Sequence, residues 1–71
     1  MDPITLRAAR RMKDVKMEEM AELLGIRRET YGKREQNPHR FSAQDAHKIC
    51  ARLGVSLGDI IEFRPNDITQ R

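Results

Sequence analysis

The chain has almost none of the residues by which small proteins are usually cross-linked. Its 71 residues include one cysteine, which excludes an internal disulfide, and cysteine and histidine together are too few for a structural zinc site. A chain this short lies near the lower limit at which a hydrophobic core holds a fold unaided. Its stability must therefore come from closely packed helices, with dimerisation as a further source.

Aromatic residues and long apolar runs are scarce too. Tyr31, Phe41 and Phe63 are the only aromatic residues, and runs of β-branched residues are few, so we expect an aliphatic and helical core. No apolar run approaches the roughly 18 residues of a membrane span, and the N-terminus lacks the apolar segment of a signal peptide. We therefore expect a soluble protein of the cytoplasm.

Signatures of catalysis are also missing. The sequence contains no phosphate-binding glycine loop, no serine or cysteine with a plausible base, and no clustered carboxylates in a chain large enough to form a cleft. His47 and Cys50 are three residues apart and can share a helix face, but two ligands do not make a metal site. We therefore expect no enzyme activity, no cofactor and no bound metal.

Positive charge is concentrated in the first 40 residues. They contain ten lysines and arginines against seven acidic residues, a net charge of +3, whereas residues 41–71 contain four of each. The whole excess of the chain thus lies in its N-terminal part. Such an imbalance suits a polyanionic partner.

A first helix is predicted at the N-terminus. Asp2 can cap it, and Pro3 suits its first position because the missing N–H has no partner there anyway. Apolar residues at three-residue steps continue the helix to about Lys13.

Two more helices follow with a tight turn between them. The second is predicted over 16–24, with acidic residues in its first turn and Gly25 as the left-handed residue that ends it. The third is predicted over 27–36. A helix, a turn that contains glycine and a second short helix form the outline of a helix-turn-helix.

Capping residues predict two helices in the C-terminal part. Ser42 with Asp45 three residues on opens a fourth helix, which Gly54 ends. Ser56 with Asp59 at the same spacing opens a short fifth helix.

The whole pattern predicts an all-α bundle of five short helices. Residues 1–63 form the expected domain. The remaining residues, 64–71, have little apolar content and are expected to be a flexible tail.

Three segments resemble one known family. Residues 15–26, VKMEEMAELLGI, resemble the first helix and turn of the Cro and lambda-repressor-like helix-turn-helix proteins. Residues 27–35, RRETYGKRE, fall where that family has its recognition helix, and residues 49–61, ICARLGVSLGDII, resemble its closing segment and final helix. The likeness covers roughly residues 4–61. It implies a lambda-repressor-like fold that binds double-stranded DNA.

The third predicted helix carries the residues that would read DNA bases. Tyr31 turns its apolar side inward, so the charged residues point outward. Arg28 suits a bidentate contact with guanine, Glu29 suits accepting from cytosine, and Lys33 suits guanine or phosphate. These three match base-contacting positions of the family, and Arg27, at its capping position, is the fourth candidate base contact. Glu29 has a second interpretation, since it can pair with Lys33 four residues on.

The resemblance also implies contacts with the DNA backbone. Lys16 stands where the family usually has a Ser or Thr cap, and Met17 where a Gln often bonds phosphate. The loop that often touches phosphate in these proteins begins directly after the third helix. The candidate phosphate contacts are Lys16, Met17, Thr30, Gln36, Asn37 and Arg40.

An ion pair and a dimer surface complete what the resemblance and the chain's end imply. Arg10 and Glu35 match a pair that joins the first and third helices, partly shielded from water. Ile60, Ile61 and Phe63 end the folded part, and some of them should remain uncovered in a monomer. A two-fold dimer built on this end would place two recognition helices about one DNA turn, roughly 34 Å, apart. We therefore expect a homodimer on an inverted-repeat operator.

Two functions fit these features. We interpret the chain as a sequence-specific, repressor-like transcription regulator of the Cro type, from a bacterium or a phage, that inserts residues 27–36 into the major groove. The alternative is a protein-interaction module of the same fold, an antirepressor or antitoxin partner with weak or no DNA binding. Lys16 and Met17 favour the alternative, because they replace the expected cap and phosphate contact. Arg27 and Arg28 disfavour it.

Overall fold

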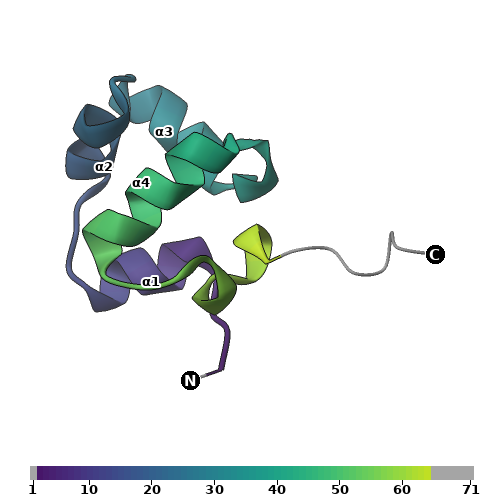
Figure 1. Ribbon diagram of the computed structural model, residues 1–71. Coiled ribbons are helices and arrows are strands. Elements are labelled where there is room, and N and C mark those ends of the chain that lie inside the picture. The colour runs from purple at the N-terminus through teal and green to yellow at the C-terminus, as the bar shows by residue number, and fades with distance from the viewer. Residues whose placement is uncertain (1, 65–71) are drawn as a thin grey trace.

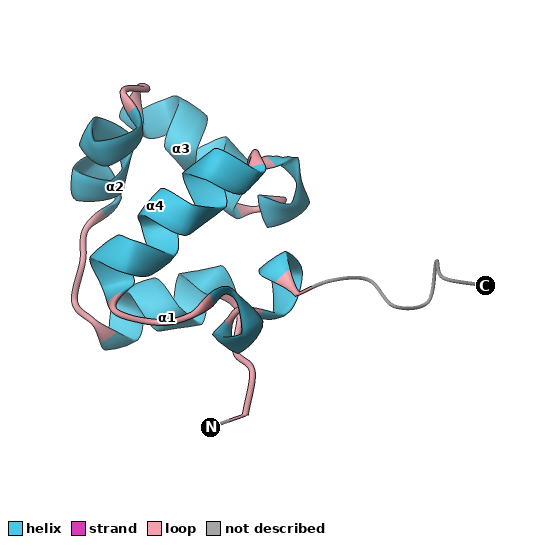
Figure 2. Cartoon of the chain, in the orientation of Figure 1, coloured by secondary structure: helices cyan, strands magenta, loops and turns pink. Residues whose placement is uncertain are grey.

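The computed structural model describes residues 2–64 as a bundle of helices (Figure 1). Every regular element in this part of the chain is an α-helix or a short 3₁₀ helix, which confirms the predicted all-α class. Short loops join the helices in chain order (Figure 2). The α-helices are α1 (Leu6–Met12), α2 (Met17–Leu24), α3 (Arg28–Glu35) and α4 (Ala43–Leu53), and the 3₁₀ helices are η1 (Pro38–Arg40), η2 (Leu57–Asp59) and η3 (Ile61–Phe63).

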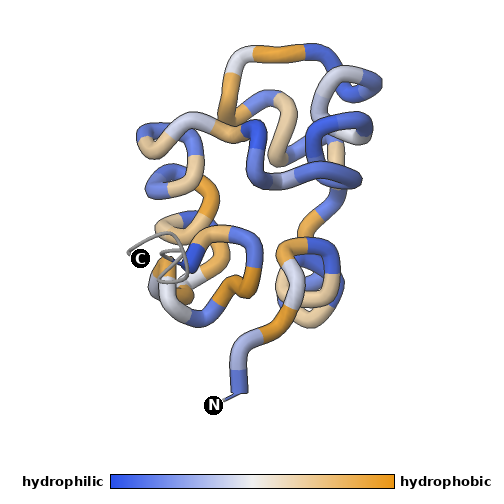
Figure 3. Tube along the Cα trace, turned by 90° about the vertical axis from the view of Figure 1, so that its right-hand side faces the viewer, coloured by the Kyte–Doolittle hydropathy of each residue, from blue (hydrophilic) through white to orange (hydrophobic). Residues whose placement is uncertain are grey.

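Helix α4 lies between α1 on one side and α2 and α3 on the other (Figure 1). Hydrophobic residues recur among hydrophilic ones along the described part of the trace (Figure 3). The inward face of α4 consists of Ala46, Ile49, Cys50 and Leu53, as its spacing predicts. The other α-helices contribute the fully buried Leu6, Met20 and Tyr31.

Helix α1 begins later than the sequence predicts. Asp2 and Pro3 lie outside it, and Thr5 is the N-cap, since Thr5 Oγ1 accepts a hydrogen bond from Ala8 N at 3.1 Å. A threonine hydroxyl satisfies one of the first amide groups of a helix, which have no partner inside it. The prediction that Asp2 caps a helix starting at Pro3 is therefore wrong.

A contact between the two ends of the domain explains the later start. Ile4 forms an isolated parallel bridge with Ile60. Ile4 N donates to Asp59 O at 2.9 Å, and Ile61 N donates to Ile4 O at 2.8 Å. These bonds hold Ile4 in an extended conformation, which excludes it from a helix. The N-terminal capping residues contain no sign of this distant partner.

The predicted fifth helix is interrupted by the same bridge. Ser56 N and Ser56 Oγ donate to Asp59 Oδ2 at 3.0 and 3.1 Å, so the predicted capping residues do meet. The helical turn then stops, because Ile60 is extended (φ −104°, ψ 118°) where it pairs with Ile4. Two 3₁₀ helices, η2 and η3, replace the α-helix. The predicted count of five α-helices is wrong, and residues 2–64 contain four.

Three other predicted helix ends are confirmed. Gly25 and Gly54 end α2 and α4 with φ angles of +70° and +72°, the left-handed region that glycine enters without a steric penalty. Ser42 Oγ caps α4 by accepting from Asp45 N at 3.1 Å. The Asp45 carboxylate lies 4.0 Å from Arg34 Nη1 and so links α4 to α3.

Membrane-crossing helices and metal sites are both missing from residues 2–64. No helix in this span is long and apolar enough to cross a membrane, and no three His, Cys, Asp or Glu side chains gather as a metal site. Cys50 is buried in the core, and burial raises the pKa of its thiol. The sequence predicts a flexible tail over residues 64–71, and residues 65–71 of it lie outside the described residues.

Candidate nucleic-acid interface

Helices α2 and α3 are joined by a tight turn and pack closely. Gly25 N donates to Glu22 O at 3.2 Å and Ile26 N to Ala21 O at 3.0 Å, which closes the end of α2. Ala21 is buried, and its small side chain lets the two helices approach. The turn thereby fixes the direction in which α3 leaves α2.

Helix α3 divides into a buried and an exposed side. Tyr31 is fully buried and Glu35 is 8% exposed. The four residues predicted to read bases all lie in solvent: Arg27, Arg28, Glu29 and Lys33. The ion pairs found within residues 2–64 do not include one between Glu29 and Lys33. Both side chains are thus available to a partner outside the chain.

Arg28 meets a carboxylate that the sequence did not lead us to expect. Its Nε lies 3.6 Å from Glu18 Oε2 in the first turn of α2, and both side chains are more than half exposed. An ion pair in solvent contributes little to stability, about 0–1 kcal/mol. The contact therefore holds Arg28 loosely, and a stronger partner can displace Glu18. The signal in the sequence was the acidic start of α2, which the helix-turn-helix geometry brings beside the start of α3.

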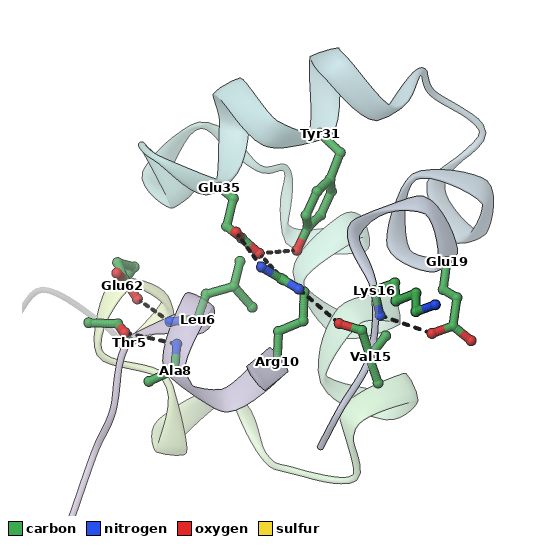
Figure 4. Close-up of polar contacts among 10 residues, drawn as sticks. All are labelled: Thr5, Leu6, Ala8, Arg10, Val15, Lys16, Glu19, Tyr31, Glu35 and Glu62. Carbon is green, nitrogen blue, oxygen red and sulfur yellow. Dashed lines mark hydrogen bonds and ion pairs between the residues drawn. The ribbon is translucent and has the colours of Figure 1, made fainter. Parts of the chain in front are cut away.

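A buried polar network anchors the other side of α3 (Figure 4). Arg10 Nε donates to Glu35 Oε2 at 2.5 Å, and Arg10 Nη2 donates to Glu35 Oε1 at 3.1 Å, a two-point contact between α1 and α3. Tyr31 O–H donates to Glu35 Oε2 at 2.9 Å, and Arg10 Nη1 donates to Val15 O at 2.8 Å. The network joins α1, α3 and the α1–α2 loop. It therefore sets the position of the exposed face of α3.

The resemblance implied only the two charged members of this network. Tyr31 and Glu35 are four residues apart, a spacing that places them on one helix face, so the hydroxyl contact could have been predicted from the sequence. The contact with the Val15 carbonyl could not have been predicted, because every residue has a backbone carbonyl and the sequence does not indicate which one will accept. The hydrogen bond to Glu35 raises the pKa of Arg10, which stays charged.

Alkaline pH should unfold the protein as its single tyrosine ionises. Burial, and then the nearby Glu35 charge, raise the pKa of Tyr31 above its ordinary value of about 10. The folded state thus holds the phenol proton more tightly than the unfolded state. The resulting stability is fully present below about pH 10 and is lost as the pH rises further. Phenolate absorbance should appear only together with loss of the helical circular dichroism signal. Ionisation near pH 10 with intact helices would show that water reaches the hydroxyl.

The start of α2 departs from the family pattern, because the residue at the capping position is a lysine and a glutamate side chain forms the capping hydrogen bond. Lys16 has no acceptor to cap the helix. Instead Lys16 N donates to Glu19 Oε1 at 2.9 Å, which also lowers the pKa of Glu19 (Figure 4). Met17 is half-buried against the core. Its thioether has no hydrogen to donate, so only its backbone N–H can bond a phosphate. Lys16, the residue before it, is exposed.

The remaining candidate phosphate contacts follow the exposed side of α3. Gln36 is its C-cap, and Asn37 leads into η1, where the chain turns. Gln36, Asn37 and Arg40 are exposed, whereas Thr30 is half-buried. Exposed polar groups thus lie near α3 both at the start of α2 and in the segment that follows α3.

The predicted dimer residues differ in their exposure. Ile60 is completely buried in the chain's own core, because its bridge with Ile4 holds it there. Its assignment to a dimer surface is therefore a mistake. Ile61 is 50% exposed. Phe63 is half-buried and meets Phe41 edge-on, with ring centroids 6.3 Å apart.

The pair α2 and α3, with its tight turn and its exposed polar face, defines a helix-turn-helix protein. A comparison with known protein families matches residues 6–60 to a family described as helix-turn-helix. The chain belongs to the Cro and lambda-repressor-like helix-turn-helix family, whose members are DNA-binding regulators. Comparisons with curated proteins and with solved structures find no match.

Proposed function

We propose that the chain is a sequence-specific transcription regulator, repressor-like and of the Cro type, that inserts α3 into the major groove of an operator. The observation that carries this proposal is the division of α3. Its exposed side presents Arg28, Glu29 and Lys33 together, while Tyr31 and Glu35 fix its other side through buried contacts. Base recognition requires that the helix be held firmly in place while its exposed side chains contact the bases, since a bidentate contact tolerates little displacement.

The exposed side chains suit particular bases. The Arg28 guanidinium matches the N7 and O6 acceptors of guanine, and the Glu29 carboxylate matches the amino group of cytosine. Lys33 reaches guanine or a phosphate. Arg27 precedes the helix and can reach either a base edge or the backbone. We expect the strongest preference at the base pair under Arg28.

Backbone contacts would flank these base contacts. At the start of α2 lie Lys16 and the amide of Met17, where α2 also presents the positive end of its dipole. Gln36, Asn37 and Arg40 follow the C-terminal end of α3, and Thr30 lies on α3 itself. Such contacts fix the orientation of a protein on DNA and carry no sequence information themselves.

A homodimer would read an inverted repeat. Ile61 is half exposed and Phe63 is half-buried, and both lie in η3 at the end of the described part, so this end offers apolar surface to a second copy. One domain of this size offers few base contacts, and a two-fold pair doubles them. The proposed setting is the cytoplasm of a bacterium or of a phage-infected host.

Selection from a pool of random 30-bp duplexes, about three turns of DNA, tests the proposal. The expected result is enrichment of one sequence that contains two inverted half-sites, about 10 bp from centre to centre. Equilibrium sedimentation on the enriched duplex should show two chains bound. Recovery of no common sequence would contradict the proposal and favour the protein-interaction module, while a single half-site with one chain bound would contradict the dimer alone.

A further inference from the structure

A groove of about 420 Å³ separates α1 from α3. On the α3 side it is lined by Gly32 and Gln36, and Met17 at the start of α2 also borders it. On the α1 side it is lined by Arg7 and Arg11. The groove therefore begins at two of the candidate phosphate contacts, Gln36 and Met17, and leads to two arginines that base recognition by α3 does not use.

Arg7 and Arg11 are the cations of this groove that are available to a ligand. The third arginine along it, Arg10, is bound to Glu35 by two hydrogen bonds. Arg7 and Arg11 are exposed, and the ion pairs within residues 2–64 include neither of them. Since they are four residues apart, they lie on one face of α1, where like charges repel in the free protein. An anion between them would relieve that repulsion.

Besides Glu35, which is paired with Arg10, the lining contains a second carboxylate. Glu62 borders the groove at the start of α1, where Glu62 Oε1 accepts from Leu6 N at 2.9 Å (Figure 4). Its charge is engaged by that amide, at the positive end of the short helix. The lining as a whole contains three guanidinium groups against two carboxylates, an excess of positive charge.

Gly32 accounts for the shape of the groove beside α3. A Cβ atom at this position would lie 3.8 Å from Met17 Sδ, at ordinary contact distance. A side chain larger than methyl would therefore fill the space between α3 and the start of α2. Alanine would fit at this position without a clash, so the open groove depends on the absence of a larger side chain.

We propose that the groove between α1 and α3 receives the sugar–phosphate backbone of duplex DNA beside the half-site, with Arg7 and Arg11 as phosphate ligands. This assignment rests on the proposed function. It extends the backbone contacts from α2 and η1 onto α1, a helix outside the helix-turn-helix pair. Arginine suits the role because its planar fork binds two phosphate oxygens at once. A second open hollow, lined by Thr5 and Ala8, also borders the same two arginines.

The test compares two double variants that differ from the wild type by the same charge. Arg7→Ala/Arg11→Ala removes the proposed ligands. Lys13→Ala/Lys48→Ala is the control, because both lysines are exposed and neither borders the groove. Affinity for the duplex enriched by the wild type is measured between about 50 and 300 mM salt, a range in which counterion release dominates. Melting curves of both variants establish that they fold, and Arg7→Gln/Arg11→Gln replaces the first variant if it does not.

The arginine variant should show a shallower dependence of log affinity on log salt, by about 0.9 for each phosphate that is no longer neutralised. It should weaken the enriched duplex and its single-base variants by the same factor, since phosphate contacts carry no base preference. The control should keep the wild-type slope. Equal slopes for the two variants would overturn the groove assignment and leave the proposed function standing. A wild type that enriches no sequence overturns the proposed function, and the groove assignment falls with it.

Discussion

Glu35→Ala is expected to lower the free energy of unfolding by about 3–5 kcal/mol, because it leaves a buried guanidinium without its partner. Glu35 accepts from two nitrogens of Arg10 and from the hydroxyl of Tyr31. The side chains of the charged pair are only 10% and 6% exposed, so the pair is largely shielded from water. Small domains are stable by about 5–15 kcal/mol in total. The variant should therefore melt many degrees below the wild type, or fail to fold at room temperature.

Two further variants separate the charge from its surroundings. Glu22→Ala removes an exposed carboxylate from α2 and should change stability by less than about 0.5 kcal/mol. Arg10→Met/Glu35→Leu removes both charges, and replacing a buried pair by apolar side chains of similar volume is often neutral or stabilising. The double variant should therefore have a free energy of unfolding much closer to that of the wild type than Glu35→Ala has. A melting curve of Glu35→Ala that matches that of Glu22→Ala would show that water reaches the pair in solution.

The same network explains which parts of the fold could be predicted from the sequence. Gly25, Gly54 and Ser42 act on residues a few positions away, so their consequences for the helix ends were predicted correctly. Tyr31 was correctly expected to face inward, because helical periodicity alone separates it from its charged neighbours. Local capping and periodicity thus predict the helix-turn-helix itself.

The errors have a single physical origin. Ile4 pairs with Ile60 from the opposite end of the domain, and this bridge both delays α1 and interrupts the predicted fifth helix. The same bridge buries Ile60 and removes it from any surface. A pairing between distant residues depends on how the helices pack, which capping residues do not reveal. The charge pair of Arg28 with Glu18 was missed for the same reason, since it forms only once α2 and α3 meet.

Arg28→Ala is expected to relax the base preference of the protein at one position of each half-site. Removing the bidentate interaction with guanine should cost about 1–3 kcal/mol on the enriched duplex. On duplexes that already carry another base there, the cost should be much smaller. Lys33→Ala should behave in the same way if Lys33 reads a base, or should weaken all duplexes equally if it holds a phosphate. The measurement is the affinity of each variant for a panel of single-base changes in the half-site.

Arg52→Ala is the matched control, because Arg52 resembles Arg28 in its surroundings and differs in its place. It is an exposed arginine whose Nη2 lies 3.4 Å from Glu19 Oε2, beside an α2 carboxylate as Arg28 is, but it projects from α4. Substitution of Arg52 should leave the profile of base preference unchanged. If Arg28→Ala weakens every duplex by the factor that Arg52→Ala does, Arg28 contributes only charge and its assignment as a base-reading residue fails. If instead the two profiles differ at one base pair alone, that base pair lies under the start of α3 and fixes the orientation of the helix in the groove.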